Sequence, residues 1–149
     1  MAPLHWPESY QPTPREPRSF WERLPLIGEW FEASDYPEVV PTLMGQLAAR
    51  PKPDPTIWGD DPVRVEMALY LCNVVQQAYG WPNDHFLPED PFEIVFLEPW
   101  DDLEIIECAM QVEEDLGLDL PDETVKEWGG TLGNVVDSLV AIQKSAHRN

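Results

Sequence analysis

Basic residues are scarce in this sequence, with 9 Lys and Arg against 28 Asp and Glu, which gives a formal net charge of −19. A field of this sign repels phosphate backbones and anionic membranes, so nucleic acid and lipid headgroups are excluded as direct partners. It attracts basic protein surfaces and accelerates encounter with them. The same charge also keeps a protein soluble without any partner, so composition alone leaves both interpretations open.

Cysteine is also scarce, and long apolar runs are missing. The two cysteines, Cys72 and Cys108, lie within apolar helical patterns, which is typical of buried thiols in a reducing compartment and not of a disulfide framework. No apolar run approaches the length of a membrane span, and no basic start followed by an apolar run marks a signal peptide. We therefore expect a cytoplasmic protein with no membrane partner.

Signatures of catalysis are missing as well. Of the three histidines, His5 and His147 lie near the two ends and His85 lies in a predicted loop, and neither cysteine has a basic neighbour in sequence. Glycine-rich phosphate loops, G-x-S-x-G, EF-hand spacing and Glu-x-x-His pairs do not occur. The sequence thus predicts a protein that is not an enzyme and that has neither a metal site nor a cofactor.

Proline, by contrast, is abundant and unevenly distributed, since 11 of the 17 prolines lie in residues 1–59. Charge divides the other way: residues 1–59 hold 8 acids and 5 bases (net −3), and residues 60–149 hold 20 acids and 4 bases (net −16). We therefore divide the chain at residue 59 into a Pro-rich, aromatic extension and an acidic helical domain.

The extension carries large apolar side chains between its prolines, among them Trp21, Trp30 and Phe31. We expect such side chains to pack on the helical domain, because burial stabilises by about 1.5–3 kcal/mol each; the alternative is an arm that binds a partner. Pro41 predicts the start of a helix over about 41–49, since proline is tolerated at the first helical position. Residues 51–59, PKPDPTIWG, are typical of a stiff linker.

Four helical segments are predicted in residues 60–149. Asp61 and Pro62 form a capped start for the first, and Gly80 ends it. A long connection over 81–99 follows, which we expect to be irregular with one helical turn. The other boundaries come from the same kinds of signal: Asp101 and Asp102 start the second helix and Gly117 ends it, Pro121 and Trp128 bound a short third, and Thr131 caps the last.

Helical periodicity assigns two faces to the second of these helices. The inward face is predicted to consist of Leu103, Ile106, Ala109, Met110 and Leu116. The solvent face is predicted to consist of Glu104, Glu107, Gln111 and Glu114.

Two stretches resemble the acyl carrier protein family. ECAMQVEEDLGLDLPDE (107–123) is similar to that family's run from helix II into helix III, and TLGNVVDSLVAI (131–142) is similar to its final helix. The match covers about residues 61–143 and includes no catalytic signature. It implies an all-α fold, namely an acyl carrier protein-like four-helix bundle, here preceded by the Pro-rich, aromatic extension.

The chain departs from that family where the phosphopantetheine arm is attached. In the family, a D-S-L triplet opens helix II and its serine carries the arm, whereas this chain reads Asp101-Asp102-Leu103, preceded by Pro99-Trp100 in place of the usual glycine. A carboxylate does not form the phosphodiester, so we expect an unmodified chain. Asp102 is then either a fixed charge in the position of the family's phosphate or simply a favourable first-turn residue.

A second D-S-L, Asp137-Ser138-Leu139, lies two turns inside the last helix. An arm-bearing serine must be exposed at a helix start, where a phosphate meets free N–H groups. We therefore expect Ser138 to be an ordinary surface or half-buried residue.

The resemblance implies a non-catalytic interaction module that docks a basic partner through its acidic second helix. The candidate partner-binding residues are Asp101, Asp102, Glu104, Glu107 and Glu114. The partner is expected to be a basic protein surface, such as that of an enzyme of acyl or polyketide-type metabolism. Two alternatives remain: a genuine carrier of acyl or peptidyl groups loaded at an atypical serine such as Ser138, and an acidic inhibitor or immunity-type protein that blocks a basic nuclease or toxin.

Overall fold

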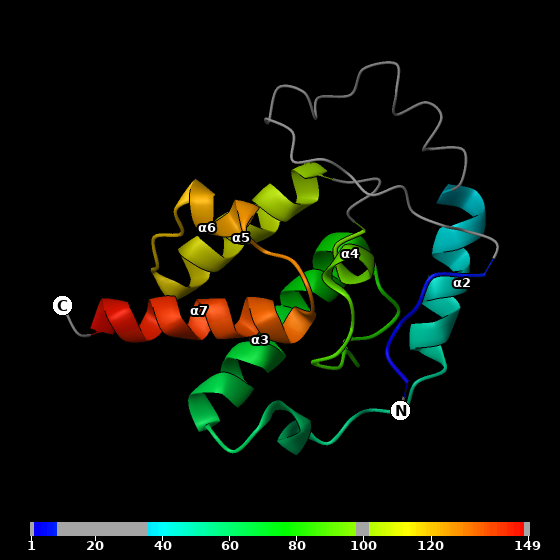
Figure 1. Cartoon of the computed structure of the whole chain (residues 1–149), viewed down its shortest axis with the longest axis horizontal. Helices are drawn as coiled ribbons and strands as arrows, with labels where there is room; N and C mark the ends of the chain where they lie inside the picture. Colours follow the sequence, from blue (N-terminus) through cyan, green and yellow to red (C-terminus); the bar gives the residue numbers. More distant parts are fainter. Residues whose placement is uncertain (1, 9–35, 98–101, 148–149) are drawn as a thin grey trace.

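The computed structural model of the chain describes residues 2–8, 36–97 and 102–147, and within them the protein is all-α, with no β-strand (Figure 1). The described helices are α2 (Tyr36–Ala48), the short 3₁₀ helix η2 (Pro55–Trp58), α3 (Pro62–Tyr79), α4 (Phe92–Val95), α5 (Asp102–Leu116), α6 (Asp122–Lys126) and α7 (Leu132–His147). The predicted short third helix and the helical turn in the long connection are both confirmed, as α6 and α4.

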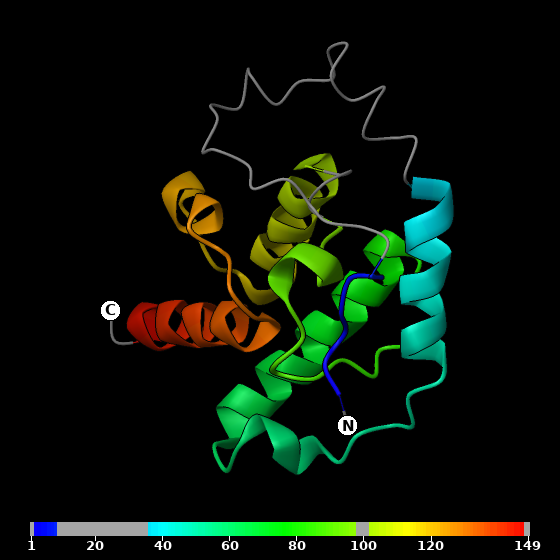
Figure 2. The same cartoon turned by 45° about the vertical axis from the view of Figure 1, so that its right-hand side comes forward.

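Helix α3 is the centre of the arrangement. It packs against α5, α7 and η2, and α4 contacts α7. Figures 1 and 2 show α2 on the opposite side of the molecule from the C-terminal end of α7, with the extended residues 2–8 running beside α2. Leu4 of this segment belongs to the same hydrophobic core as residues of α3, α4 and α7.

The ends of α3 follow from local chemistry. The Asp61 carboxylate accepts a hydrogen bond from the Val63 N–H at 3.0 Å, and Pro62 occupies the first turn. At the other end Gly80 has φ +72°, which favours glycine, and its N–H donates to the Gln76 carbonyl at 2.9 Å. Both predicted boundaries of this helix are confirmed.

The end of α5 and the start of α7 also match the prediction. Gly117 has φ +63°, and the Leu118 N–H donates to the Glu113 carbonyl at 3.2 Å, which is the long bond of a Schellman motif. Leu118 is buried, and a hydrophobic residue at this position frequently accompanies the motif. At α7, the Thr131 hydroxyl accepts a hydrogen bond from the Asn134 N–H at 3.3 Å.

Carbonyl groups of the long connection bind the first turn of α7. The Asp90 carbonyl accepts from the Leu132 N–H at 2.8 Å, and the Pro88 carbonyl accepts from the Gly133 N–H at 2.9 Å. These N–H groups have no partner within the helix itself, because the first four of any α-helix lack one. The connection therefore replaces solvent at this helix start and is fixed by it.

The prediction for the start of α2 is wrong. The helix begins at Tyr36, five residues before Pro41, which lies inside it. Val39, Leu43 and Leu47 recur at four-residue spacing and are buried, so one apolar face continues past the proline. Pro41 itself is exposed, and the helix tolerates the hydrogen bond that its ring removes.

Side chains from residues 2–8 and 36–58 belong to the same hydrophobic core as those of the later helices. The predicted linker contains η2, and its Trp58 is 2% exposed. Leu4, Leu43 and Leu47 are also almost completely buried in this core. Trp21, Trp30 and Phe31, for which packing was predicted, lie outside the described residues. No described helix has the length and hydrophobicity that a membrane crossing requires.

Candidate functional site

The orientation of α5 differs from the prediction. Its buried side chains are Ile105, Cys108, Ala109 and Val112, whereas Ile106 is 37% exposed and Met110 is 61% exposed. The predicted inward face is therefore wrong at Ile106 and Met110, and right at Ala109 and at Leu116, which packs against the core. The side chain of Leu103 lies outside the described part of the chain. The described part of the helix is turned so that two large apolar side chains lie in solvent.

The sequence permits either orientation, because apolar residues occupy more than half of this helix. The buried set repeats at i, i+3, i+4 and i+7, which is as regular as the set that was predicted. It is the side of α5 that faces the core, and α5 is in contact with α3. The sequence pattern alone therefore does not decide between the two orientations.

The predicted acidic residues are only partly brought together. Asp101 and the side chain of Asp102 lie outside the described part of the chain, although α5 begins at Asp102 as predicted. Glu104 is half-buried, and Glu107 and Glu114 are exposed on the side opposite the core.

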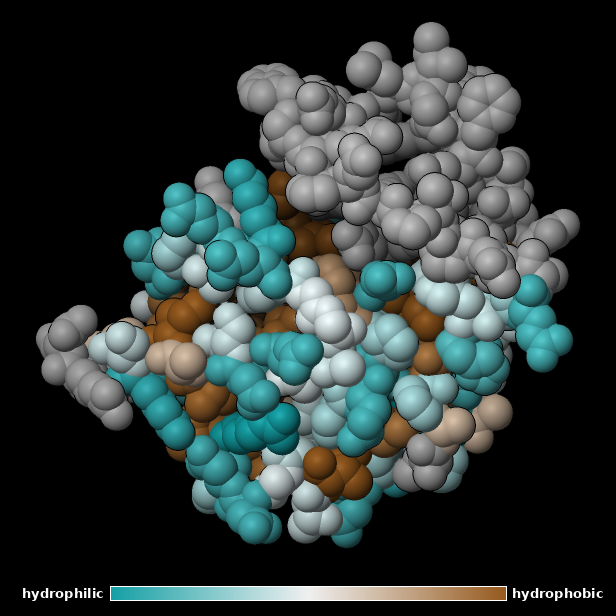
Figure 3. Space-filling view, in the orientation of Figure 1, coloured by the Kyte–Doolittle hydropathy of each residue, from teal (hydrophilic) through white to brown (hydrophobic). Residues whose placement is uncertain are grey.

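Ile106 and Met110 join Glu107 and Glu114 on this outward side, and we call these four residues the α5 face. Residues three or four apart are neighbours on a helix surface, so Met110 lies next to Ile106, Glu107 and Glu114. Figure 3 shows hydrophobic side chains coming to the surface between hydrophilic ones in the region of α5. Among the described residues, neither Glu107 nor Glu114 forms a salt bridge. The α5 face thus combines apolar contact area with negative charge that forms no salt bridge to the described residues.

Asp115, at the edge of α5, is engaged within the protein. The Tyr70 hydroxyl of α3 donates to its carboxylate at 2.6 Å, and the Gln111 amide donates to it at 2.9 Å. Burial and this carboxylate raise the pKa of Tyr70 above its ordinary value. Asp115 therefore ties α5 to α3, and its charge serves packing.

Ser138 lies in the middle of α7 and is half-buried, as predicted. Its neighbour Asp137 accepts a hydrogen bond from Arg64 Nε at 2.7 Å, which links α7 to α3. Arg64 also donates to the Trp58 carbonyl and lies 5.8 Å from the centroid of the Trp58 ring. The second D-S-L is thus part of a helix-to-helix contact and lies away from a helix start.

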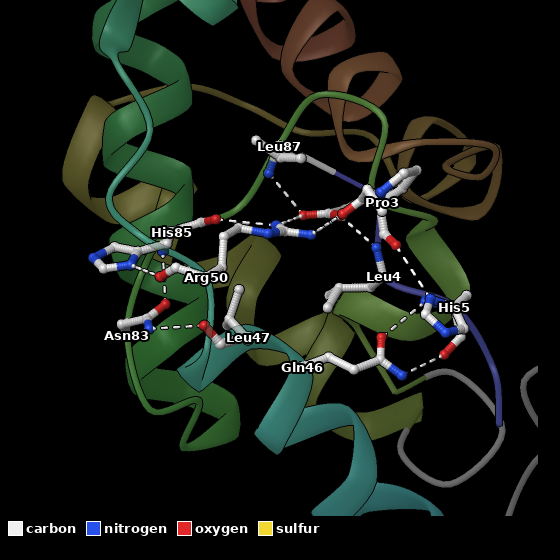
Figure 4. A network of polar contacts seen from close by, with 11 residues as sticks. Pro3, Leu4, His5, Gln46, Leu47, Arg50, Asn83, His85 and Leu87 are labelled. Atoms are coloured by element: carbon white, nitrogen blue, oxygen red, sulfur yellow. Dashed lines mark hydrogen bonds and ion pairs between the residues drawn. The ribbon is translucent and has the colours of Figure 1, made fainter.

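A buried ion pair that sequence reasoning missed lies on the other side of the molecule (Figure 4). Arg50 donates to the Asp90 carboxylate at 2.7 and 3.0 Å, and the two side chains are 5% and 0% exposed. The same carboxylate accepts from the Leu4 N–H at 2.8 Å and the Leu87 N–H at 2.7 Å. Four donors compensate this buried charge, as burial of a carboxylate demands.

Further contacts hold Arg50 in place. Its guanidinium donates to the His85 carbonyl at 3.0 Å, and His85 Nδ1 lies 2.9 Å from the Arg50 carbonyl. Asn83 connects the same loop to α2, since its amide donates to the Leu47 carbonyl at 3.1 Å. His85 is therefore fixed by main-chain contacts in this loop and has a structural role.

Both cysteines are buried in this fold. Cys72 is 1% exposed, and burial raises the pKa of its thiol. Cys108 is buried too, and no group of three His, Cys, Asp or Glu side chains among the described residues is arranged to bind a metal ion.

Comparison with known proteins gives no assignment: no protein-family model, curated protein or solved structure matches the chain significantly. The functional argument therefore rests on the residues themselves.

Proposed function

We propose that the chain is a non-catalytic interaction module with an acyl carrier protein-like four-helix bundle, in which α3, α5, α6 and α7 correspond to helices I to IV. A long connection between the first two helices and a short third helix support this correspondence. In this proposal α5 docks a basic protein surface, and the chain is not phosphopantetheinylated.

The observation that carries the proposal is the α5 face. Glu107 and Glu114 stand in solvent beside Met110, which is 61% exposed. Desolvating a methionine side chain contributes to affinity, and its flexible thioether adapts to irregular partner surfaces. Carboxylates around it accelerate encounter with a basic partner and fix its orientation.

The proposed partner therefore has Lys or Arg side chains around an apolar patch. The resemblance to acyl carrier proteins favours an enzyme of acyl or polyketide-type metabolism. A basic toxin or nuclease, which an acidic inhibitor would block, has the same surface chemistry, and the identity of the captured partner distinguishes the two.

The test is a pull-down with matched charge reversals. Glu107→Lys with Glu114→Lys changes the formal charge from −19 to −15, because each substitution adds two units. Glu66→Lys with Glu127→Lys makes the same change at two exposed residues outside α5, one in α3 and one directly after α6. We expect the first double variant to lose the captured partner and the second to retain it. Equal loss by both variants would show that binding depends on the net charge of the chain and not on the α5 face.

Intact mass addresses the carrier alternative. The chain is incubated with coenzyme A and a promiscuous phosphopantetheinyl transferase, and an ordinary carrier serves as the positive control. We expect no mass change, because the serine of the family's triplet is replaced by Asp102. A gain of one phosphopantetheine would overturn the unmodified state, and Ser138 would be the first residue to map.

A further inference from the structure

The extended residues 2–8, which we call the strap, are bound to the rest of the protein in the manner of a peptide ligand (Figure 4). Arg50 Nη2 donates to the Ala2 carbonyl at 2.9 Å, and the Leu4 N–H donates to Asp90 at 2.8 Å. Gln46 binds both main-chain groups of His5, accepting from its N–H at 3.2 Å and donating to its carbonyl at 3.0 Å. Side chains of the protein therefore form hydrogen bonds with the main chain of the strap.

Alternate side chains of the strap point into the protein. Leu4 is 2% exposed and belongs to the hydrophobic core, His5 is exposed, and Trp6 is half-buried and packs against the core. This period of two is that of an extended strand. In peptide recognition by extended segments, main-chain hydrogen bonds supply affinity and pockets for alternate side chains supply specificity. Here the specific pattern is Leu-x-Trp.

Two of the three groups that bind the strap, Arg50 and Asp90, are also held by contacts that do not involve it. Asp90 and Arg50 pair with each other, and Asp90 also accepts from the Leu87 N–H. Arg50 is fixed further by the His85 carbonyl, and Gln46 lies on α2. The Arg50–Asp90 part of the receptor side is thus preorganised, which lowers the entropic cost of binding a peptide. We call the surface formed by Gln46, Arg50 and Asp90 the strap groove.

The connection between strap and groove is long. Residues 9–35, 27 in number, separate the strap from α2 in the sequence. A chain of this length spans at most about 90 Å when extended. Its length therefore permits the strap to reach the groove of a neighbouring copy, and exchange of an identical element is a low-cost route to a closed dimer.

We propose that the strap groove is a binding site for extended Leu-x-Trp segments and that a second copy of this chain is its partner, donating its strap in exchange. The contacts described above show that the strap fits this groove. Every copy of the chain carries both a strap and a groove. Because each strap belongs to the same chain as its groove, its effective concentration there is on the order of millimolar. Exchange between two copies therefore requires a high protein concentration, or a substitution that weakens the binding of a strap to the groove of its own chain. This inference is independent of the function proposed for α5.

A complementing pair of full-length variants tests it. Leu4→Asp breaks the strap and leaves the groove, whereas Gln46→Ala weakens the groove and leaves the strap. We expect each variant alone to be monomeric and their equimolar mixture to contain a 1:1 dimer, measured by size-exclusion chromatography with light scattering. Gln77→Ala, at an exposed glutamine that pairs only locally with Asn73, is the matched control and should not complement Leu4→Asp.

A peptide probe separates the groove from the partner. A fluorescent peptide of sequence APLHWPE should bind the Leu4→Asp variant about tenfold or more tighter than the wild type, whose own strap competes. The same peptide with aspartate in place of its leucine should not bind. Peptide binding without a mixed dimer would contradict the claim that a second copy is the partner. A folded Leu4→Asp variant that binds no peptide would contradict the claim that the strap groove is a binding site.

If Leu4→Asp does not fold, a second receptor keeps the test decisive. A protease site placed within residues 9–35 of the wild-type chain is cut after folding, which frees the strap from α2 without changing either. We expect the released strap to exchange with the labelled peptide. A cut protein that retains its own strap and takes up no labelled peptide contradicts the proposal.

Discussion

Around Asp90 each oxygen of a buried carboxylate accepts two hydrogen bonds, whereas Glu107 and Glu114 on the α5 face stand in solvent without a salt bridge among the described residues. The charge of Asp90 is compensated inside the molecule, whereas the charges of Glu107 and Glu114 are exposed to solvent. Buried charge that is fully paired belongs to the architecture. Exposed charge beside an exposed methionine can change without harm to the fold and is therefore available for recognition.

The largest expected effect concerns the buried pair. Asp90→Ala leaves Arg50 buried without a counter-charge, and we expect a loss of about 3–5 kcal/mol in the free energy of unfolding, measured by urea denaturation. Asp137→Ala is the control, since it breaks an ion pair whose Asp137 side chain is 58% exposed and should cost at most about 1 kcal/mol. Similar losses for both variants would contradict the distinction between the two kinds of charge.

Two adjacent isoleucines test the orientation of α5. Ile105 is 8% exposed and Ile106 is 37% exposed, so truncation of the first should leave a cavity and truncation of the second should not. We expect Ile105→Ala to lower the free energy of unfolding by about 2–4 kcal/mol and Ile106→Ala by about 1 kcal/mol or less. The reverse order in thermal or urea unfolding would restore the orientation that the sequence predicted.

Two glycines differ in the space around them, since Gly133 is tightly packed and Gly45 is not. A Cβ on Gly133 would meet the Pro88 carbonyl oxygen at 3.0 Å, so Gly133→Ala should destabilise by about 1–3 kcal/mol. A Cβ on Gly45, inside α2, would meet nothing within 4 Å, so Gly45→Ala should stabilise by about 0.5–1 kcal/mol. If Gly133→Ala were neutral in the same unfolding assay, the contact between the long connection and α7 would be looser than described.

The last prediction concerns the reactivity of the two cysteines and involves no change in the stability of the protein. Burial raises the pKa of the Cys72 thiol, and Cys108 is buried as well. We expect both to react with a thiol reagent at pH 8 at least about 100-fold more slowly in the native protein than in guanidinium chloride, because the reaction waits for opening of the structure. Rapid labelling of the native protein, located by peptide mapping, would show that one of them is accessible.

The parts of this fold that the sequence predicted are those fixed within a few residues. Asp61, Gly80 and Gly117 act on backbone groups at most five residues away, so their roles follow from local pattern. The face of α5 was mispredicted because Ile105 and Ile106 are chemically identical and only packing against α3 distinguishes them. Local pattern carries no such information.

The buried pair and the strap were not predictable for a related reason. Arg50 and Asp90 lie 40 residues apart, and Leu4 lies 86 residues from Asp90. An arginine in a proline-rich segment and an aspartate in an acidic domain resemble surface charges until the fold places them together. The acids of the second helix, in contrast, were expected at its surface, and Glu107 and Glu114 are exposed.

The most direct test of the α5 face is hydrogen–deuterium exchange of the chain with and without the partner captured in the pull-down. We expect binding to slow exchange over residues 104–116, with peptides from α3 and α7 unchanged. The Glu107→Lys, Glu114→Lys variant should show no protection at the same partner concentration. Protection that appears elsewhere while α5 exchanges as in the unbound chain would contradict the account.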